Sequence, residues 1–241
     1  MSDVKNETVI ANQSEQKDAE KIAEISKKGY QLLKEDRIED AIAAFKSILQ
    51  IEDNNNYALV GLGDCERKQN HFKNAVDFYS KCLSVHPGNN YALFGLADCY
   101  RGMNQQYRSV EYWNRILKND PDNKVILTRA GDAYRNTGDY KTAEEYYNRA
   151  MEIDFDIYAA LGLALICKGE GNFDEAIERL NNLIKNDPKN YRLYIDLADC
   201  YLKINDKNKA VEVLKTFQKT GTKSTAISEM LGKIIEGKPL N

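Results

Sequence analysis

The sequence predicts an all-α solenoid of six helical hairpins closed by one extra helix. The first observation is an apolar stretch that starts at Tyr57 and returns at Tyr91, about 34 residues later, with weaker copies farther along the chain. The second is an alanine or serine at a matching place in every copy. The third is a proline that follows three of the second segments, at Pro87, Pro121 and Pro188, where a helix cannot continue. A fixed interval of this length indicates stacked helix-turn-helix units.

Six units follow one another along the chain. They are 22–55, 56–89, 90–123, 124–156, 157–190 and 191–224. Each has an apolar first segment, a turn and an amphipathic second segment, so a hairpin can bury its apolar face only against its neighbours. A large residue in the second segment, such as Phe45 or Tyr79, is expected to fill the space toward the next hairpin. Residues 225–236 look like the first helix of a seventh unit, capped by Ser224 or Thr225, and are expected to cover the open end.

The two ends of the chain are expected to lie outside the stack. Residues 1–18 are polar and carry little that could be buried, which predicts a flexible N-terminal tail. Residues 237–241 form a short C-terminal tail. The solenoid domain is therefore expected to span 19–236.

The repeated residues resemble those of the tetratricopeptide repeat family, whose unit is a helix-turn-helix of about 34 residues. The fourth unit is most similar to the family pattern. Its matching residues are Leu127, Ala130, Gly131, Tyr134, Gly138, Tyr140, Ala143, Tyr147 and Ala150. The resemblance implies an α-solenoid that winds as a right-handed superhelix.

Composition and charge argue against several classes of partner. Lysine plus arginine is 34 and aspartate plus glutamate is 37, so the net charge of -3 predicts neither a nucleic-acid nor an anionic-membrane partner. No stretch approaches the roughly 18 apolar residues that would insert in a membrane, and no signal-peptide core is visible. We expect a cytoplasmic protein.

The residue types that usually carry chemistry do not form a recognisable set. Cys65, Cys99 and Cys200 share one repeat position, which predicts buried structural thiols and no disulfide. His71 and His86 are the only histidines and are interpreted as surface turn residues. No phosphate-binding glycine loop, nucleophile motif or metal-ligand spacing is present. The sequence therefore predicts a protein that is not an enzyme, with no catalytic residues, no metal and no cofactor.

The resemblance also implies a binding groove. In the family, the first helices of successive units line a concave surface, which places 2, 5, 9, 12 and 13 of each unit face. Candidate partner-binding residues at or beside these places are Tyr57, Val60, Asp64, Arg67, Tyr91, Phe94, Asp98, Arg101, Arg129, Asp132, Arg135, Tyr158 and Leu161. Three glycines beside them, Gly61, Gly95 and Gly162, are expected to leave the backbone open to a partner, and tight packing within the stack is the alternative use.

The aspartates and arginines of this groove have two interpretations. Aspartate recurs at place 9, including Asp199 in the sixth unit, and arginine recurs at place 12. Each Asp-x-x-Arg pair could be an i,i+3 contact on one helix, which contributes only about 0.2 to 0.5 kcal/mol. Alternatively, the arginines and tyrosines could point into the groove as binding hot spots. The two can coexist.

The predicted function is that of an adaptor that binds a peptide or helix of another protein in the groove. The chaperone-binding members of the family hold a carboxylate with lysines, asparagines and an arginine. The corresponding places here hold Ser26, Tyr30, Gly61, Tyr91 and Gly95, so this mode of recognition is not expected. The alternative is a structural subunit that assembles through the ends or the convex face of the solenoid, with itself as a homo-oligomer or with other chains.

Overall fold

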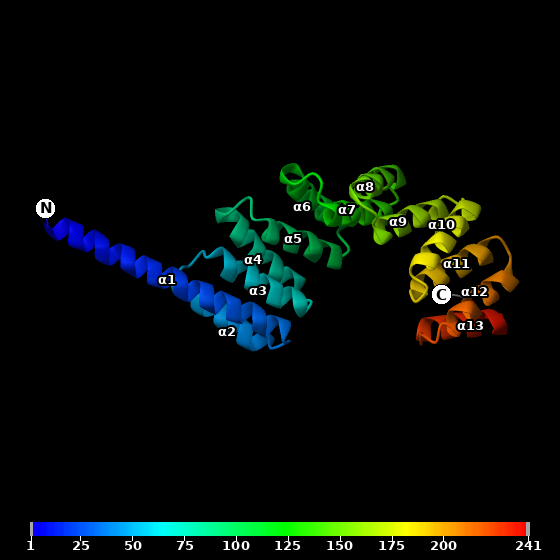
Figure 1. The fold of residues 1–241 in the computed structure, drawn as a ribbon, viewed down its shortest axis with the longest axis horizontal. Helices are drawn as coiled ribbons and strands as arrows, with labels where there is room; N and C mark the ends of the chain where they lie inside the picture. The colour runs from blue at the N-terminus through cyan, green and yellow to red at the C-terminus, as the bar shows by residue number, and fades with distance from the viewer. Residues whose placement is uncertain (1, 240–241) are drawn as a thin grey trace. The chain divides into compact units, whose positions relative to one another are not determined.

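The computed structural model describes the backbone of residues 2–239 and the side chains of residues 16–239. Within these residues the chain is all-α and forms thirteen helices, six helix-turn-helix pairs and one final helix (Figure 1). The predicted fold class is thus confirmed. The chain divides between Asn119 and Asp120 into two compact units, called here the N-terminal and the C-terminal unit. Among the described residues, no helix is both long and apolar enough to cross a membrane.

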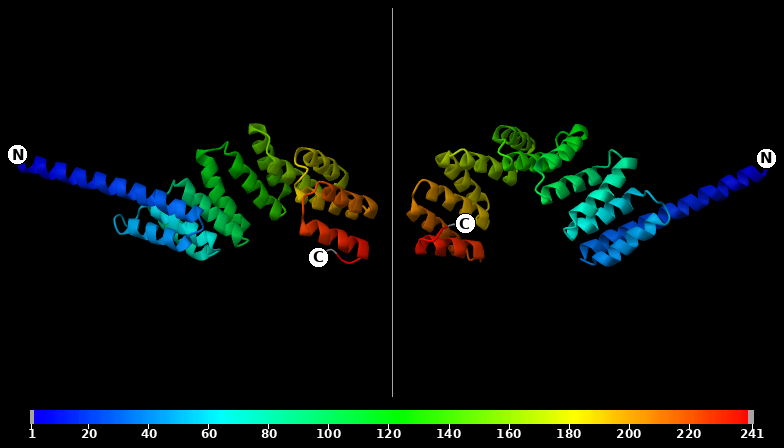
Figure 2. Two further views of the ribbon diagram at one scale, coloured as in Figure 1. Left: turned by 60° about the horizontal axis from the view of Figure 1, so that its bottom comes forward. Right: turned by 180° about the vertical axis from the view of Figure 1, so that it is seen from behind.

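The N-terminal unit holds three hairpins. Its helices are α1 (Ser2–Lys34), α2 (Ile38–Leu49), α3 (Asn56–Lys68), α4 (Phe72–Val85), α5 (Asn90–Gly102) and α6 (Gln106–Asn119). Each helix packs against the next one along the chain, and the first helices also touch each other, α1 against α3 and α3 against α5 (Figure 2). This arrangement places the first helices side by side on one face of the unit.

The C-terminal unit holds three further hairpins and the final helix. Its helices are α7 (Lys124–Asn136), α8 (Tyr140–Ile153), α9 (Ile157–Gly169), α10 (Phe173–Asn186), α11 (Tyr191–Lys203), α12 (Lys207–Lys219) and α13 (Thr225–Glu236). Helix α13 spans the residues predicted for the capping helix and packs on α12 and α11. The Ser224 side chain accepts a hydrogen bond from the Ile227 backbone N–H at 3.4 Å, so of the two predicted caps Ser224 is the one in the structure.

Helix α1 is longer than the sequence predicts. It begins at Ser2, so the backbone of residues 2–18 is helical in the structure, where the sequence predicts a flexible polar tail outside the stack. Its N-terminal part continues beyond α2 and α3 (Figure 1). The flexibility expected for residues 1–18 stays a prediction, as do the domain limits at 19 and 236 and the right-handed superhelix.

One backbone feature marks the turn inside every unit. The second residue after each first helix adopts a left-handed conformation at the same place of all six units. These residues are Asp36, Asn70, Asn104, Gly138, Gly171 and Asn205, with φ between 59° and 84°. Asparagine, aspartate and glycine adopt this conformation most readily. The identity of the place in all six units fixes the repeat register independently of the apolar pattern.

A second recurring feature starts the first helices. In units two to six the residue before the helix is an asparagine or aspartate whose side chain accepts a hydrogen bond from a backbone N–H of the first turn. These caps are Asn55, Asn89, Asn123, Asp156 and Asn190. Because such a cap is typically worth about 1 kcal/mol, it gives each unit a defined starting point.

Candidate functional site

The face formed by α1, α3 and α5 exposes aromatic side chains. Tyr57 on α3 is 56% exposed and Tyr91 on α5 is 78% exposed, and Tyr158 on α9 of the C-terminal unit is 66% exposed. Large aromatic side chains left in solvent at one repeated place are available to a partner. In contrast, Val60 is only 3% exposed, and Phe94 and Leu161 are half-buried.

Burial of Val60 differs from the sequence expectation. Val60 belongs to the same buried apolar cluster as Tyr79, and it lies in a run of α3 that is buried from Ala58 to Gly63. Its side chain therefore belongs to the core and offers a partner only a small apolar floor.

A pocket of about 500 Å³ lies among these first helices. Its lining residues, called here the tyrosine pocket, are Tyr30, Asn56, Tyr57, Val60, Asp64, Asn89 and Tyr91. A second hollow of about 510 Å³ shares Tyr30 and Tyr57 with it and extends along α1 past Ala19 and Ile22. Pockets of this size that are mainly apolar with a few polar groups are typical of binding sites.

The tyrosine pocket brings together four of the candidate residues and adds others. Tyr57, Val60, Asp64 and Tyr91 line it. Sequence reasoning assigned no binding role to Tyr30, which occupies place 9 of the first unit, where the next units have aspartate. Arg129, Asp132, Arg135, Tyr158 and Leu161 lie in the C-terminal unit, so their participation stays a prediction for that unit by itself.

The Asp-x-x-Arg pairs are joined to a buried tyrosine of the second helix. Tyr79 donates its hydroxyl hydrogen to Asp64 Oδ1 at 2.8 Å, and Arg67 Nη2 lies 3.1 Å from the same oxygen. Arg67 Nε donates to the Tyr79 hydroxyl oxygen at 3.3 Å. Each side chain thus fixes the other two.

The fourth unit repeats this three-residue arrangement. Tyr147 donates to Asp132 Oδ1 at 2.7 Å, and Arg135 Nε donates to the Tyr147 hydroxyl oxygen at 3.3 Å. The ion pair between Arg135 and Asp132 is 3.6 Å long. The arrangement is therefore a property of the repeat wherever tyrosine occupies this place of the second helix.

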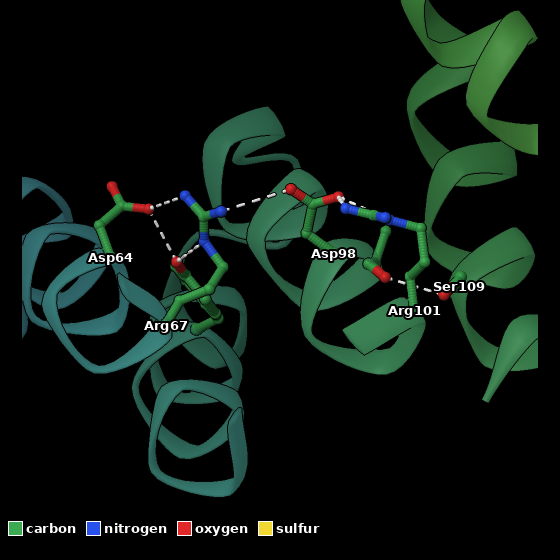
Figure 3. A network of polar contacts seen from close by, with 7 residues as sticks. Asp64, Arg67, Asp98, Arg101 and Ser109 are labelled. Carbon is green, nitrogen blue, oxygen red and sulfur yellow. Dashed lines mark hydrogen bonds and ion pairs between the residues drawn. The ribbon is translucent and has the colours of Figure 1, made fainter. Parts of the chain in front are cut away.

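Basic side chains also link successive units. Arg67 Nη1 lies 3.4 Å from Asp98 Oδ2, while Arg101 Nη2 lies 3.2 Å from Asp98 Oδ1 (Figure 3). In the C-terminal unit Lys168 lies 2.8 Å from Asp199 and 2.9 Å from Asp196. The sequence identified neither Lys168 nor Asp196, although Lys168 stands at the same place as the arginines. The i,i+3 interpretation of the ladder is thus present in the geometry, with cross-repeat pairs in addition.

Aromatic rings occupy the space beside each of the three groove glycines. A Cβ added to Gly61 would lie 2.4 Å from the Phe45 ring, one on Gly95 would lie 2.3 Å from the Tyr79 ring, and one on Gly162 would lie 2.2 Å from the Tyr147 ring. The expectation that these glycines leave the backbone open to a partner is therefore wrong. Their use is the alternative one, close packing between hairpins.

All five cysteines are free and buried. Burial raises the pKa of the Cys65 and Cys99 thiols to about 12 and that of the Cys200 thiol to about 11. Thiols with pKa values in this range are protonated near neutral pH and react slowly. Among the residues that the structure describes, no group of three histidines, cysteines or carboxylates could hold a metal ion.

Alkaline pH is expected to destabilise the fold. The thiol pKa is 9.0 in the reference state and about 12 for folded Cys65, so the folded state holds its proton more tightly. A raised folded pKa gives stability that is complete below about pH 9 and is lost as the pH rises toward 12. Burial also raises the pKa of Tyr79 and Tyr147, which adds to the same loss. Thermal midpoints measured at increasing pH should stay level up to about pH 9 and then fall. A midpoint that stays level through pH 11 contradicts this.

Comparisons with known proteins agree with the repeat pattern. Models of the tetratricopeptide repeat match residues 57–89, 91–123, 126–157 and 169–234. A tetratricopeptide repeat protein from Parabacteroides merdae is 26% identical, with a TM-score of 0.79 over 90% of this chain and 87% of the other. No curated protein matches the chain by sequence.

Two further solved structures show the fold alone, because their identity is low. The PilF protein of Pseudomonas aeruginosa is 15% identical, with a TM-score of 0.72 over 90% of this chain and 99% of the other. YrrB, described as a TPR protein with an unusual peptide-binding site, is 19% identical, with a TM-score of 0.58 over 72% of this chain and 90% of the other.

Proposed function

This chain is a tetratricopeptide repeat protein, and from that premise we propose that it is an adaptor that binds a segment of a partner protein on the first-helix face of its N-terminal unit. Members of the family generally mediate protein–protein interactions and are generally non-catalytic. The observation that carries the proposal is the tyrosine pocket between α1, α3 and α5, with the exposed rings of Tyr57 and Tyr91 at its edge. The description of YrrB as a peptide-binding protein supports it by analogy of fold.

Several features favour an extended peptide or a helix as the occupant. The hollow continues from the tyrosine pocket along α1, so a bound segment would contact more than one first helix. Tyrosine is enriched among interface hot spots because it buries much area with little loss of conformational freedom. Asn56 also lies in the lining, and an asparagine side chain can both donate and accept hydrogen bonds, as a peptide backbone requires.

The test uses peptides selected from a random display library on the full chain. We expect the combined substitution Tyr57→Ala and Tyr91→Ala to weaken binding of the selected peptides at least tenfold, since each ring is a hot-spot candidate and tenfold equals about 1.4 kcal/mol. Fluorescence anisotropy with labelled peptides measures the affinity.

The matched control is Tyr107→Ala. Tyr107 is 75% exposed but lies on α6, a second helix, so its removal changes the exposed aromatic area without touching the first-helix face. Peptide affinity should be unchanged in this variant. Selected peptides that bind the double variant as tightly as the wild type would show that they do not bind at the first-helix face.

A further inference from the structure

The tyrosine pocket has a fixed aromatic wall. The Tyr30 ring packs edge-on against the buried Phe45 ring, with centroids 5.0 Å apart and an interplanar angle of 68°. Its hydroxyl lies 3.5 Å from the Tyr57 backbone carbonyl oxygen. Tyr57 and Tyr91 complete the set, so three tyrosines line a space of about 500 Å³. Aromatic faces gathered in this way attract cations through the ring quadrupole.

The pocket also carries one carboxylate and no basic side chain. Among its seven lining residues, Asp64 is the only one charged at neutral pH. Both hydrogen bonds to its carboxylate, from Tyr79 and from Arg67, go to Oδ1, and no described residue donates to Oδ2. Figure 3 shows this second oxygen turned away from Arg67. The Asp64 side chain is 22% exposed, so Oδ2 can accept a hydrogen bond from a bound group.

Arg67 contacts only one of the two carboxylate oxygens of Asp64. Its guanidinium is held between Asp64 Oδ1 and Asp98 Oδ2 and does not line the pocket. Arg101 also contacts Asp98, and neither arginine donates to Asp64 Oδ2. Burial, and next the Asp64 carboxylate, raise the pKa of Tyr30, so this ring lines the pocket as a neutral phenol.

We propose that the tyrosine pocket takes a protonated lysine or arginine side chain of the bound segment. The aliphatic stem would lie against the rings of Tyr30, Tyr57 and Tyr91, and the charged end would donate to Asp64 Oδ2. Such a charge-assisted hydrogen bond is about twice as strong as a neutral one. This inference rests on the proposed function, and it gives that function a partner chemistry: a basic segment, whereas the carboxylate-binding members of the family take an acidic one.

The experiment compares charged and neutral versions of the same peptide. In peptides selected on the full chain, each lysine is replaced by norleucine and each arginine by citrulline, which keep the aliphatic stem and remove the charge. On the wild type we expect at one basic position a loss of about tenfold in affinity. On Asp64→Asn and on Tyr91→Leu the charged and neutral peptides should differ by no more than about twofold to threefold. Tyr107→Ala should keep the full tenfold difference.

The two pocket variants cover different risks. Asp64→Asn could disturb the network around Arg67, so its thermal midpoint is measured alongside. Tyr91→Leu removes an aromatic ring that is 78% exposed and keeps an apolar side chain in its place. The peptide affinities of this variant therefore do not depend on the network around Arg67. A loss of discrimination in Tyr91→Leu alone still supports the inference.

The outcomes separate this inference from the function on which it rests. Selected peptides that need Tyr57 and Tyr91 but tolerate neutral replacement at every position would overturn the basic-segment inference and leave the binding face intact. Discrimination that persists in both pocket variants would overturn it as well. If no peptide depends on Tyr57 and Tyr91, the proposed function fails and the inference fails with it.

Discussion

Gly61→Ala is expected to lower the free energy of unfolding by about 2 kcal/mol, although alanine is the better helix former by roughly 1 kcal/mol. An added Cβ would lie 2.4 Å from Cζ of Phe45, 2.5 Å from Cε1 and 2.6 Å from Cε2. The ring cannot move aside easily, because Phe45 is fully buried and also packs close to Gly29 of α1, where an added Cβ would lie 2.8 Å from it. Overpacking of this kind shifts backbone as well as side chains.

The control for this prediction is Gly232→Ala. Gly232 lies inside α13, and a Cβ added there meets no atom within 4 Å. The same substitution should therefore stabilise the protein by up to about 1 kcal/mol, because only the helix propensity changes. Urea unfolding followed by far-ultraviolet circular dichroism measures both. Gly61→Ala as stable as Gly232→Ala would show that the hairpins do not pack as tightly as the structure has them.

A compensating substitution sharpens the test. Leu180 of the fifth unit stands at the place of Phe45. The residue of the sixth unit that corresponds to Gly61 is Asp196, which has a Cβ. The fold therefore tolerates a side chain at this place where the facing residue is leucine. Combining Gly61→Ala with Phe45→Leu should give a loss smaller than the sum of the two single losses by about 1 kcal/mol.

Much of the fold could be predicted from the sequence, because each unit repeats the same physical requirements. The interval between Tyr57 and Tyr91 reports the length of one hairpin, and a capping helix after the sixth hairpin follows from the need to cover an apolar end. The left-handed turn residues, such as Asn70, are a further sign of the repeat, since only a few residue types adopt that conformation readily. The helical start of α1 was not predictable from polarity alone.

The candidate site was less predictable, because residue place does not reveal distance. The sequence could not show that Val60 is buried in the core. It also could not show that the space beside Gly61 is occupied by the Phe45 ring. Pairs between units were also hidden. Lys168 and Asp199 are 2.8 Å apart but lie on different hairpins, and only the stacking of α9 and α11 through α10 brings them together.

Arg67→Ala is expected to lower the free energy of unfolding by about 2 kcal/mol, far more than an ordinary surface ion pair contributes. Arg67 lies 3.1 Å from Asp64, 3.4 Å from Asp98 and 3.3 Å from the Tyr79 hydroxyl. The Asp98 side chain is only 8% exposed, so the substitution removes one of the arginines that contact its charge in a place that water reaches poorly. The Arg67 side chain is 34% exposed, which keeps the expected loss below that of a fully buried pair.

The comparison with Arg37→Ala decides whether the network or merely the ion pair matters. Arg37 and Asp40 lie 2.7 Å apart, closer than Arg67 lies to either of its carboxylates, but their side chains are 58% and 56% exposed. Distance alone would predict the larger loss for Arg37→Ala, whereas burial and shared partners predict less than about 0.5 kcal/mol for it. Urea unfolding of both variants separates the two. Equal losses would mean that the carboxylates are well solvated and that Arg67 is available to a ligand. A large loss confined to Arg67→Ala would assign this arginine to the connection between the second and third hairpins, which leaves Asp64 Oδ2 and the three tyrosines as the groups that a partner can use.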